Sequence, residues 1–132
     1  MTIGLDTSLT LRLLTGVPEA QADVARRLVA SSPSPVAISD LVVGETYLAL
    51  RHHYGVPHGE ATRVLHALLS DPRIRGTGVA RSILADPESR RSAKSQPGLM
   101  DRLIHGDYDR EGLAVATFDR ALGRLQGAQR LG

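Results

Sequence analysis

Residues 112–120 read GLAVATFDR, and this stretch gives the clearest indication of the fold. Residues 113–118 form a short apolar run between a glycine and a charged pair, which is the pattern of a fully buried strand in a parallel sheet. Asp119 follows at the carboxyl end of this predicted strand, where open α/β sheets place their functional groups. The apolar residues 3–5 are likewise followed directly by Asp6. The sequence therefore predicts two strand ends that deliver carboxylates to one acidic pocket.

Helical segments and strands alternate along the rest of the chain. Strands are expected over residues 1–6, 36–38, 74–80 and 113–118. Helices are expected from a cap at Thr7 or Ser8 to Gly16, and over residues 19–30, 40–54 (capped by Ser39), 57–69, 81–93 (interrupted by Pro87) and 99–108. The tail over residues 120–131 fits either a short helix or a helical turn with a return strand. This alternation predicts an α/β fold with a parallel sheet covered on both faces.

Length and composition limit the class of protein. A chain of 132 residues is expected to form a single domain over residues 1–132. The chain contains no cysteine, which fits a reducing compartment, and it shows neither a secretory signal nor an apolar run long enough for a membrane span. We therefore expect a soluble, cytoplasmic protein that does not associate with a membrane.

Basic residues are concentrated in one segment, although the formal net charge is only +2. This cluster is consistent with a nucleic-acid footprint, while the preference for arginine over lysine is also what a GC-rich genome produces. Its members are Arg73, Arg75, Arg81, Arg90, Arg91 and Lys94.

Two further acidic residues occupy unusual positions on predicted helices. Glu45 shares a helical face with Leu41, Gly44, Leu48 and His52. A carboxylate within an apolar stripe is costly unless it is paired, solvated in a pocket or bound to a metal. Asp101 lies beside the positions expected to face the core on the helix over residues 99–108, namely Met100, Leu103 and Ile104.

Asp6, Glu45, Asp101 and Asp119 together suggest a metal site. Each one alone has a structural explanation, which for Asp6 is the capping of a helix N-terminus. Clustered carboxylates repel one another unless a cation offsets their charge, and oxygen ligands without cysteine favour Mg²⁺ or Mn²⁺. Such a cation lowers the pKa of bound water and neutralises charge on a phosphodiester during attack.

Four blocks of the sequence resemble the PIN-domain superfamily and, within it, the VapC-type toxins of bacterial toxin–antitoxin pairs. They cover most of the chain, and residues 57–97 match only in pattern. The blocks are IGLDTSLTLRLL (residues 3–14), AISDLVVGETYLALRHHYGV (37–56), LMDRLIHGDYDREG (99–112) and LAVATFDRALGRLQGAQRL (113–131).

The resemblance implies a PIN-like three-layer α/β/α sandwich with a short central parallel sheet. It implies a Mg²⁺- or Mn²⁺-dependent endoribonuclease whose catalytic residues and metal ligands are Asp6, Glu45, Asp101 and Asp119. The substrate-positioning residues would be Thr7, Ser8, Thr117 and Arg102. Many relatives carry another acidic residue where this chain has Ala121, which argues against a fifth ligand here.

The resemblance also implies partners. An RNA substrate, a cognate VapB-like antitoxin that inserts a segment into the acidic groove, and a second copy of the chain in a homodimer are expected. The expected dimer face is the helix pair over residues 41–54 and 57–69.

Other classes of protein fit less well. A haloacid-dehalogenase-like phosphatase needs an aspartate where this chain has Ser8, and a response-regulator receiver needs a phosphoacceptor aspartate and a late lysine that find no match. The histidines lack the spacing of a zinc site and are interpreted as structural or surface residues: His52, His53, His58, His66 and His105. The alternative that stays open is a PIN-like module that binds RNA or protein without cutting it.

Overall fold

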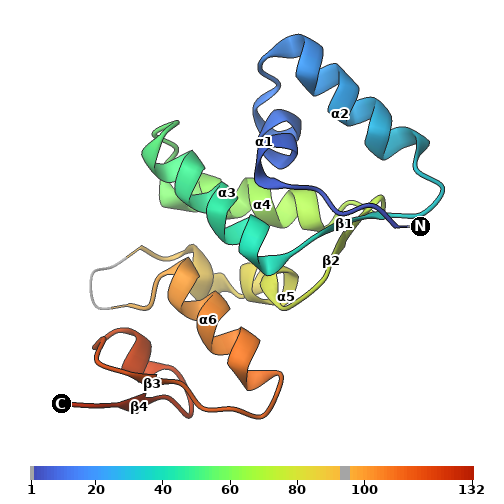
Figure 1. Ribbon diagram of the computed structural model, residues 1–132. Coiled ribbons are helices and arrows are strands. Elements are labelled where there is room, and N and C mark those ends of the chain that lie inside the picture. Colours follow the sequence, from blue (N-terminus) through green and yellow to red (C-terminus); the bar gives the residue numbers. More distant parts are fainter. Residues whose placement is uncertain (1, 93–95) are drawn as a thin grey trace.

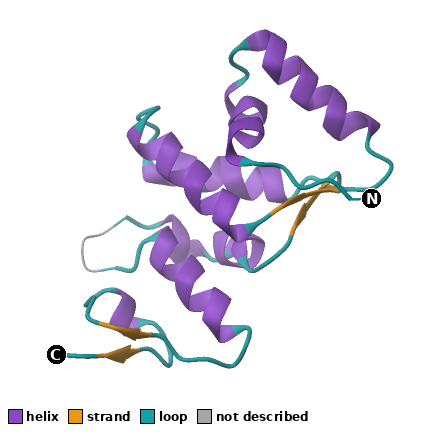
Figure 2. Cartoon of the chain, in the orientation of Figure 1, coloured by secondary structure: helices purple, strands orange, loops and turns teal. Residues whose placement is uncertain are grey.

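The computed structural model describes residues 2–92 and 96–132, and it has a mixed α/β architecture that is mostly helical (Figures 1 and 2). The predicted positions that fall on Met1, Ala93 and Lys94 lie outside these residues. In chain order the elements are α1 (Thr7–Thr15), α2 (Glu19–Ser31), β1 (Val36–Ile38), α3 (Asp40–His52), α4 (His58–Leu69), β2 (Ile74–Gly76), α5 (Ala80–Ala85), the 3₁₀ helix η1 (Pro87–Arg90), α6 (Leu99–Asp109), β3 (Ala116–Thr117), the 3₁₀ helix η2 (Leu122–Arg124) and β4 (Gln129–Arg130).

Local sequence signals place most helix ends as expected. Gly16 ends α1 in the left-handed conformation with φ 75°, which glycine adopts without steric cost. The Ser39 hydroxyl accepts a hydrogen bond from the Val42 N–H at 3.2 Å and caps α3. Pro87 separates α5 from η1, as its missing N–H requires. The N-cap of α1 is Asp6 rather than Thr7 or Ser8.

The first sheet is smaller than the sequence predicts. β1 and β2 run parallel, with Val36 opposite Ile74, and residues 74–80 contribute only the strand Ile74–Gly76. The predicted strand over residues 1–6 is reduced, within the described residues, to a parallel bridge between Gly4 and Ala37. It is short because Asp6 already caps α1, which leaves only residues 3–5 free to extend along β1.

The prediction of a fully buried strand over residues 113–118 is wrong. Only Ala116–Thr117 form β3, which pairs in parallel with β4 as a separate two-stranded sheet. Phe118 is 79% exposed, whereas Val115 is buried. β3 contacts β4 and η2 and lies at the end of the molecule opposite α1 and α2, away from the first sheet (Figure 1). The described residues therefore form two small parallel sheets instead of one central sheet.

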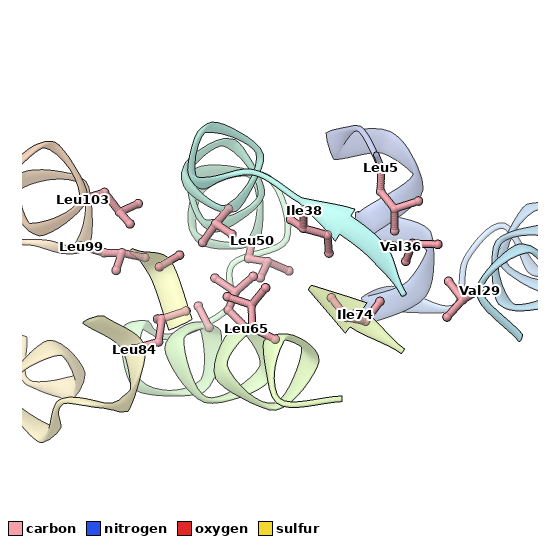
Figure 3. Packing of buried hydrophobic residues seen from close by; sticks show 14 residues of the cluster. Leu5, Val29, Val36, Ile38, Leu50, Leu65, Ile74, Leu84, Leu99 and Leu103 are labelled. Atoms are coloured by element: carbon pink, nitrogen blue, oxygen red, sulfur yellow. The ribbon is translucent and has the colours of Figure 1, made fainter. Parts of the chain in front are cut away.

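The hydrophobic core lies between the first sheet and the helices around it (Figure 3). Its members reach from Leu5 to Leu103, and Leu65 of α4 and Leu84 of α5 are fully buried within it. Aliphatic side chains fill it, as expected of a chain with an aromatic content of 3%.

The buried faces of α3 and α6 differ from those predicted. α3 buries Val43, Thr46 and Leu50, while Leu41 is 72% exposed and Glu45 is also exposed. Glu45 is thus not in a buried apolar stripe, and its carboxylate bears no burial cost. Leu residues occupy both sides of this helix, so periodicity alone could not identify the side that packs on α4. On α6, Leu99 and Leu103 are buried and Met100 is half-buried, but Ile104 is exposed, contrary to expectation.

Two buried threonines offer a matched test of this packing. The Thr46 and Thr62 side chains are both 0% exposed. The Thr62 hydroxyl donates to the carbonyls of His58 and Gly59 at 3.1 and 3.0 Å, whereas the Thr46 hydroxyl has no partner within the described part of the chain. A buried hydroxyl without a partner costs about 1–3 kcal/mol of desolvation.

We therefore expect Thr46→Val to raise the free energy of unfolding by about 1 kcal/mol and Thr62→Val to lower it by about 1 kcal/mol. Both replacements are isosteric and keep a β-branched residue in a helix, so helix propensity changes little. Urea unfolding of both variants measures the difference. An equal loss of stability in the two variants would contradict the environment described for Thr46.

No helix within residues 2–92 or 96–132 is long and apolar enough to cross a membrane.

Candidate functional site

Asp6 stands where the N-terminal segment turns into α1. Its carboxylate oxygen Oδ1 accepts hydrogen bonds from the Leu9 N–H at 2.9 Å and the Ser8 hydroxyl at 2.8 Å. These bonds, with the Leu9 N–H contributing most, lower the pKa of Asp6 below its ordinary value of 3.8. The second oxygen accepts no hydrogen bond from the described protein groups, so an exposed, ionised carboxylate keeps a free acceptor at the start of α1.

Thr7 joins the start of α1 to α3. Its hydroxyl donates to Oε1 of Glu45 at 2.9 Å. This bond crosses between two helices that also pack against each other, and it holds the Glu45 carboxylate next to the residue that follows Asp6. The structure therefore brings Asp6, Thr7, Ser8 and Glu45 into one neighbourhood. The Thr7 hydroxyl donates to Glu45 and the Ser8 hydroxyl donates to Asp6, so each of the two carboxylates is held by one hydroxyl.

Asp101 lies at the third position of α6. It accepts a hydrogen bond from the Gly98 N–H at 3.3 Å and so stabilises the first turn of its own helix. α6 packs on α3 where Gly44 lacks a side chain, since a Cβ there would lie 2.8 Å from the Met100 sulfur. Asp101 is therefore on a helix that contacts the helix of Glu45, although no bond joins the two carboxylates among the described residues.

Asp119 and Thr117 belong to the C-terminal sheet. The Thr117 hydroxyl accepts a hydrogen bond from the Asp119 N–H at 2.9 Å, and Asp119 Oδ1 accepts the Leu122 N–H at 2.8 Å. Asp119 thus follows a strand, as expected, but its carboxylate starts η2. β3, the strand that precedes Asp119, lies at the end of the molecule opposite α1, the helix that Asp6 caps (Figure 1).

Arg102 follows Asp101 on α6 and was expected to lie beside the acidic residues. It instead lines a cavity that Asp101 does not line. Its Nε is buried and has no partner among the residues that the structure describes. It lines a cavity of about 350 Å³ together with His105, whose Nε2 is 2.7 Å from the Gln126 carbonyl oxygen, and Ser82.

The acidic residues only partly fit a metal ion in this arrangement. Carboxylate oxygens suit Mg²⁺ or Mn²⁺, and Asp6 and Glu45 lie close together through Thr7. Across residues 2–92 and 96–132, however, no group of three or more Asp, Glu, His or Cys side chains is placed so that it could hold a metal ion. Of the four expected ligands, Asp6 and Glu45 are the pair that a described hydrogen bond connects, through Thr7, the residue after Asp6.

His58 is a structural residue, which is one of the two roles expected of the histidines, but the sequence did not identify its partners. It is 8% exposed, with Nε2 2.9 Å from the Ser89 carbonyl oxygen and Nδ1 2.7 Å from the Tyr47 hydroxyl. A carbonyl only accepts, so Nε2 carries the proton, and in the neutral ring Nδ1 accepts from Tyr47. His58 thereby ties α3, α4 and η1 together. The sequence signal that could have indicated this role is the position of His58 directly after Pro57, at the first residue of α4.

No protein-family model matches the chain, and no curated protein matches it significantly.

Proposed function

We propose that this chain is a PIN-like endoribonuclease that hydrolyses RNA phosphodiester bonds and depends on Mg²⁺ or Mn²⁺. The observation that carries the proposal is the linked arrangement of Asp6, Thr7, Ser8 and Glu45, in which two hydroxyls orient two exposed carboxylates. Capping of α1 would account for Asp6 alone. It does not account for the second carboxylate, Glu45 of α3, which Thr7 holds nearby. The four-block resemblance to PIN-domain toxins supplies the reaction and the partners.

Asp101 and Asp119 complete the proposed set of ligands, and both are exposed or half-buried at the ends of α6 and β3. Asp101 lies on α6, which packs on α3, whereas Asp119 follows β3 at the end of the molecule opposite α1. Assembly of the full set therefore requires the C-terminal part of the chain, with Asp119, to approach α1.

The partners of this proposal follow the resemblance. A VapB-like antitoxin would cover the acidic residues, because a basic side chain from a partner can replace a cation beside carboxylates. A homodimer through α3 and α4 is supported by the exposed Leu41 and Leu48 side chains on α3. The cytoplasm is the proposed location, since RNA is found there and the chain has no cysteine.

A non-catalytic RNA- or protein-binding module is the second candidate, and the position of β3 at the end of the molecule opposite α1 favours it. The two candidates differ in their response to metal. We expect purified protein to cleave a labelled pool of total RNA with Mg²⁺ or Mn²⁺ and to leave it intact in EDTA.

Each preparation should be checked by mass spectrometry for a copurified partner, because a bound antitoxin would also suppress cleavage. Protein that is free of any partner and leaves RNA intact with both metals would overturn the nuclease proposal. Binding of RNA without cleavage would then support the second candidate.

A further inference from the structure

A cavity of about 860 Å³ lies between the end of α4, β2 and α5. It is open to solvent, and none of Asp6, Glu45, Asp101 or Asp119 lines it. Polar and charged side chains approach it from three elements and the loop between two of them. They are His66, Ser70, Asp71, Arg75, Arg81 and Ser82.

The positive charges of this cavity are free to bind a ligand. Arg75 and Arg81 are both exposed, and their guanidinium groups have no ion pair or hydrogen bond within the described ranges. Many other arginines of the chain are committed to acidic neighbours, such as Arg26 to Asp23 and Arg110 to Asp107. The cavity is therefore lined by two guanidinium groups, one from β2 and one from α5, that have no partner among the described residues.

Asp71 is the acidic residue in the lining, and its charge is already balanced. Arg73 holds it with Nη2 2.8 Å from Oδ2 and Nε 3.2 Å from Oδ1. These bonds lower the pKa of Asp71 to about 2, so the pair is fully ionised at neutral pH. Because Arg73 neutralises Asp71, the remaining charge facing the cavity is that of Arg75 and Arg81.

We propose that this cavity binds backbone phosphates of an RNA strand outside the acidic site. The proposal rests on the proposed function, which supplies RNA as the substrate. Arginine presents a planar fork of donors that matches the oxygens of a phosphate. No Phe, Tyr or Trp is among the described residues that line the cavity, so the large rings on which proteins most often stack bases are missing from it. Contacts to the backbone alone bind RNA with little regard to its sequence.

The neighbouring surface favours a strand over a free phosphate ion. Ser82 lines both this cavity and the cavity of about 350 Å³ that contains Arg102. A strand bound at Arg75 and Arg81 can thus continue over α5 towards α6, where Asp101 precedes Arg102. A single phosphate ion would fill only a small part of a cavity of about 860 Å³.

Binding to single-stranded RNA in EDTA tests this proposal without any cleavage. The affinity of a fluorescein-labelled oligonucleotide of mixed sequence is measured by anisotropy at several KCl concentrations, for wild type and for the double variant Arg75→Gln/Arg81→Gln. Each phosphate contact contributes about −0.7 to the slope of log affinity against log salt for single strands. We expect the double variant to have a slope shallower by about 1.4 and an affinity roughly ten- to a hundredfold lower at low salt.

The double variant Arg26→Gln/Arg27→Gln removes the same charge from α2 and serves as the matched control. It should bind RNA nearly as wild type does, and all three proteins should have the same urea midpoint. Equal slopes for the two double variants would overturn the proposal. A titration with inorganic phosphate alone, followed by NMR of the His66 ring, distinguishes the source of the phosphate. Two results together would overturn the RNA proposal and assign the cavity to a small anion. The first is that phosphate shifts the His66 NMR signals to saturation, and the second is that Arg75→Gln/Arg81→Gln binds RNA with unchanged affinity.

This result is independent of catalysis. Protein that never cuts RNA but loses RNA affinity in Arg75→Gln/Arg81→Gln keeps the phosphate site and loses the nuclease proposal. Protein that cuts RNA while Arg75→Gln/Arg81→Gln binds as the control does keeps the nuclease proposal and loses the phosphate site.

Discussion

Asp6→Asn is expected to lower metal-dependent RNA cleavage by at least about a hundredfold while leaving the fold intact. Removal of a group that only orients a metal ligand already costs about ten- to a hundredfold, and loss of a ligand's charge costs more. Asparagine is as good an N-cap as aspartate, so its side-chain oxygen can still accept the Leu9 N–H and preserve the start of α1. Cleavage rates with Mg²⁺ and urea unfolding of the same preparation measure the two effects separately.

Two variants serve as controls for this experiment. Asp23→Asn removes an exposed aspartate paired with Arg26 on α2 and should leave cleavage unchanged. Asp6→Ala removes the cap as well and should lower the free energy of unfolding by about 1 kcal/mol. Full cleavage by a well-folded Asp6→Asn protein would show that Asp6 acts only as the cap of α1, and the proposed metal site would then be wrong.

His58→Ala is expected to lower the free energy of unfolding by about 2–4 kcal/mol, which is a large part of the stability of a small domain. The change leaves the Ser89 carbonyl and the Tyr47 hydroxyl without their partner and opens a space between α3, α4 and η1. Chemical denaturation followed by circular dichroism measures the loss.

His58→Phe separates the two causes, because it keeps a ring of similar size and removes only the hydrogen bonds. We expect it to lie between wild type and His58→Ala. His52→Ala, an exposed histidine at the end of α3, should change stability by less than about 0.5 kcal/mol. A stable His58→Ala protein would mean that the buried network around His58 contributes little to the fold.

The helices of this protein could be predicted from sequence because their signals are local. A capping side chain acts on an N–H within three residues, and a glycine in the left-handed conformation ends a helix at its own position. Ser39, Gly16 and Pro87 therefore marked helix ends correctly. The placement of Asp6 next to the Ser8 hydroxyl and the Leu9 N–H is local in the same way.

The strands were predicted less well because a strand depends on a partner far along the chain. The apolar run over residues 113–118 has the composition of a buried strand, yet only Ala116–Thr117 pair, and they pair with β4. The composition of a segment indicates whether it can be buried. It does not indicate which other strands or helices pack against it. The same limit applies to α3, where Leu41 and Leu50 fall on opposite sides of the helix and only packing selects Leu50 for the core.

The sequence by itself determined most of the helices, helix ends such as those at Gly16 and Ser39, and the carboxylates near the ends of elements, since these depend on contacts within a few residues. Only the tertiary structure decided that Thr7 reaches Glu45, that His58 bridges three elements, and that Arg75 and Arg81 face one cavity while Arg73 is bound to Asp71. It also placed β3 at the end of the molecule opposite α1, where β3 pairs with β4. Such relations join residues that are distant in the chain, and packing between elements, rather than local preference, fixes them.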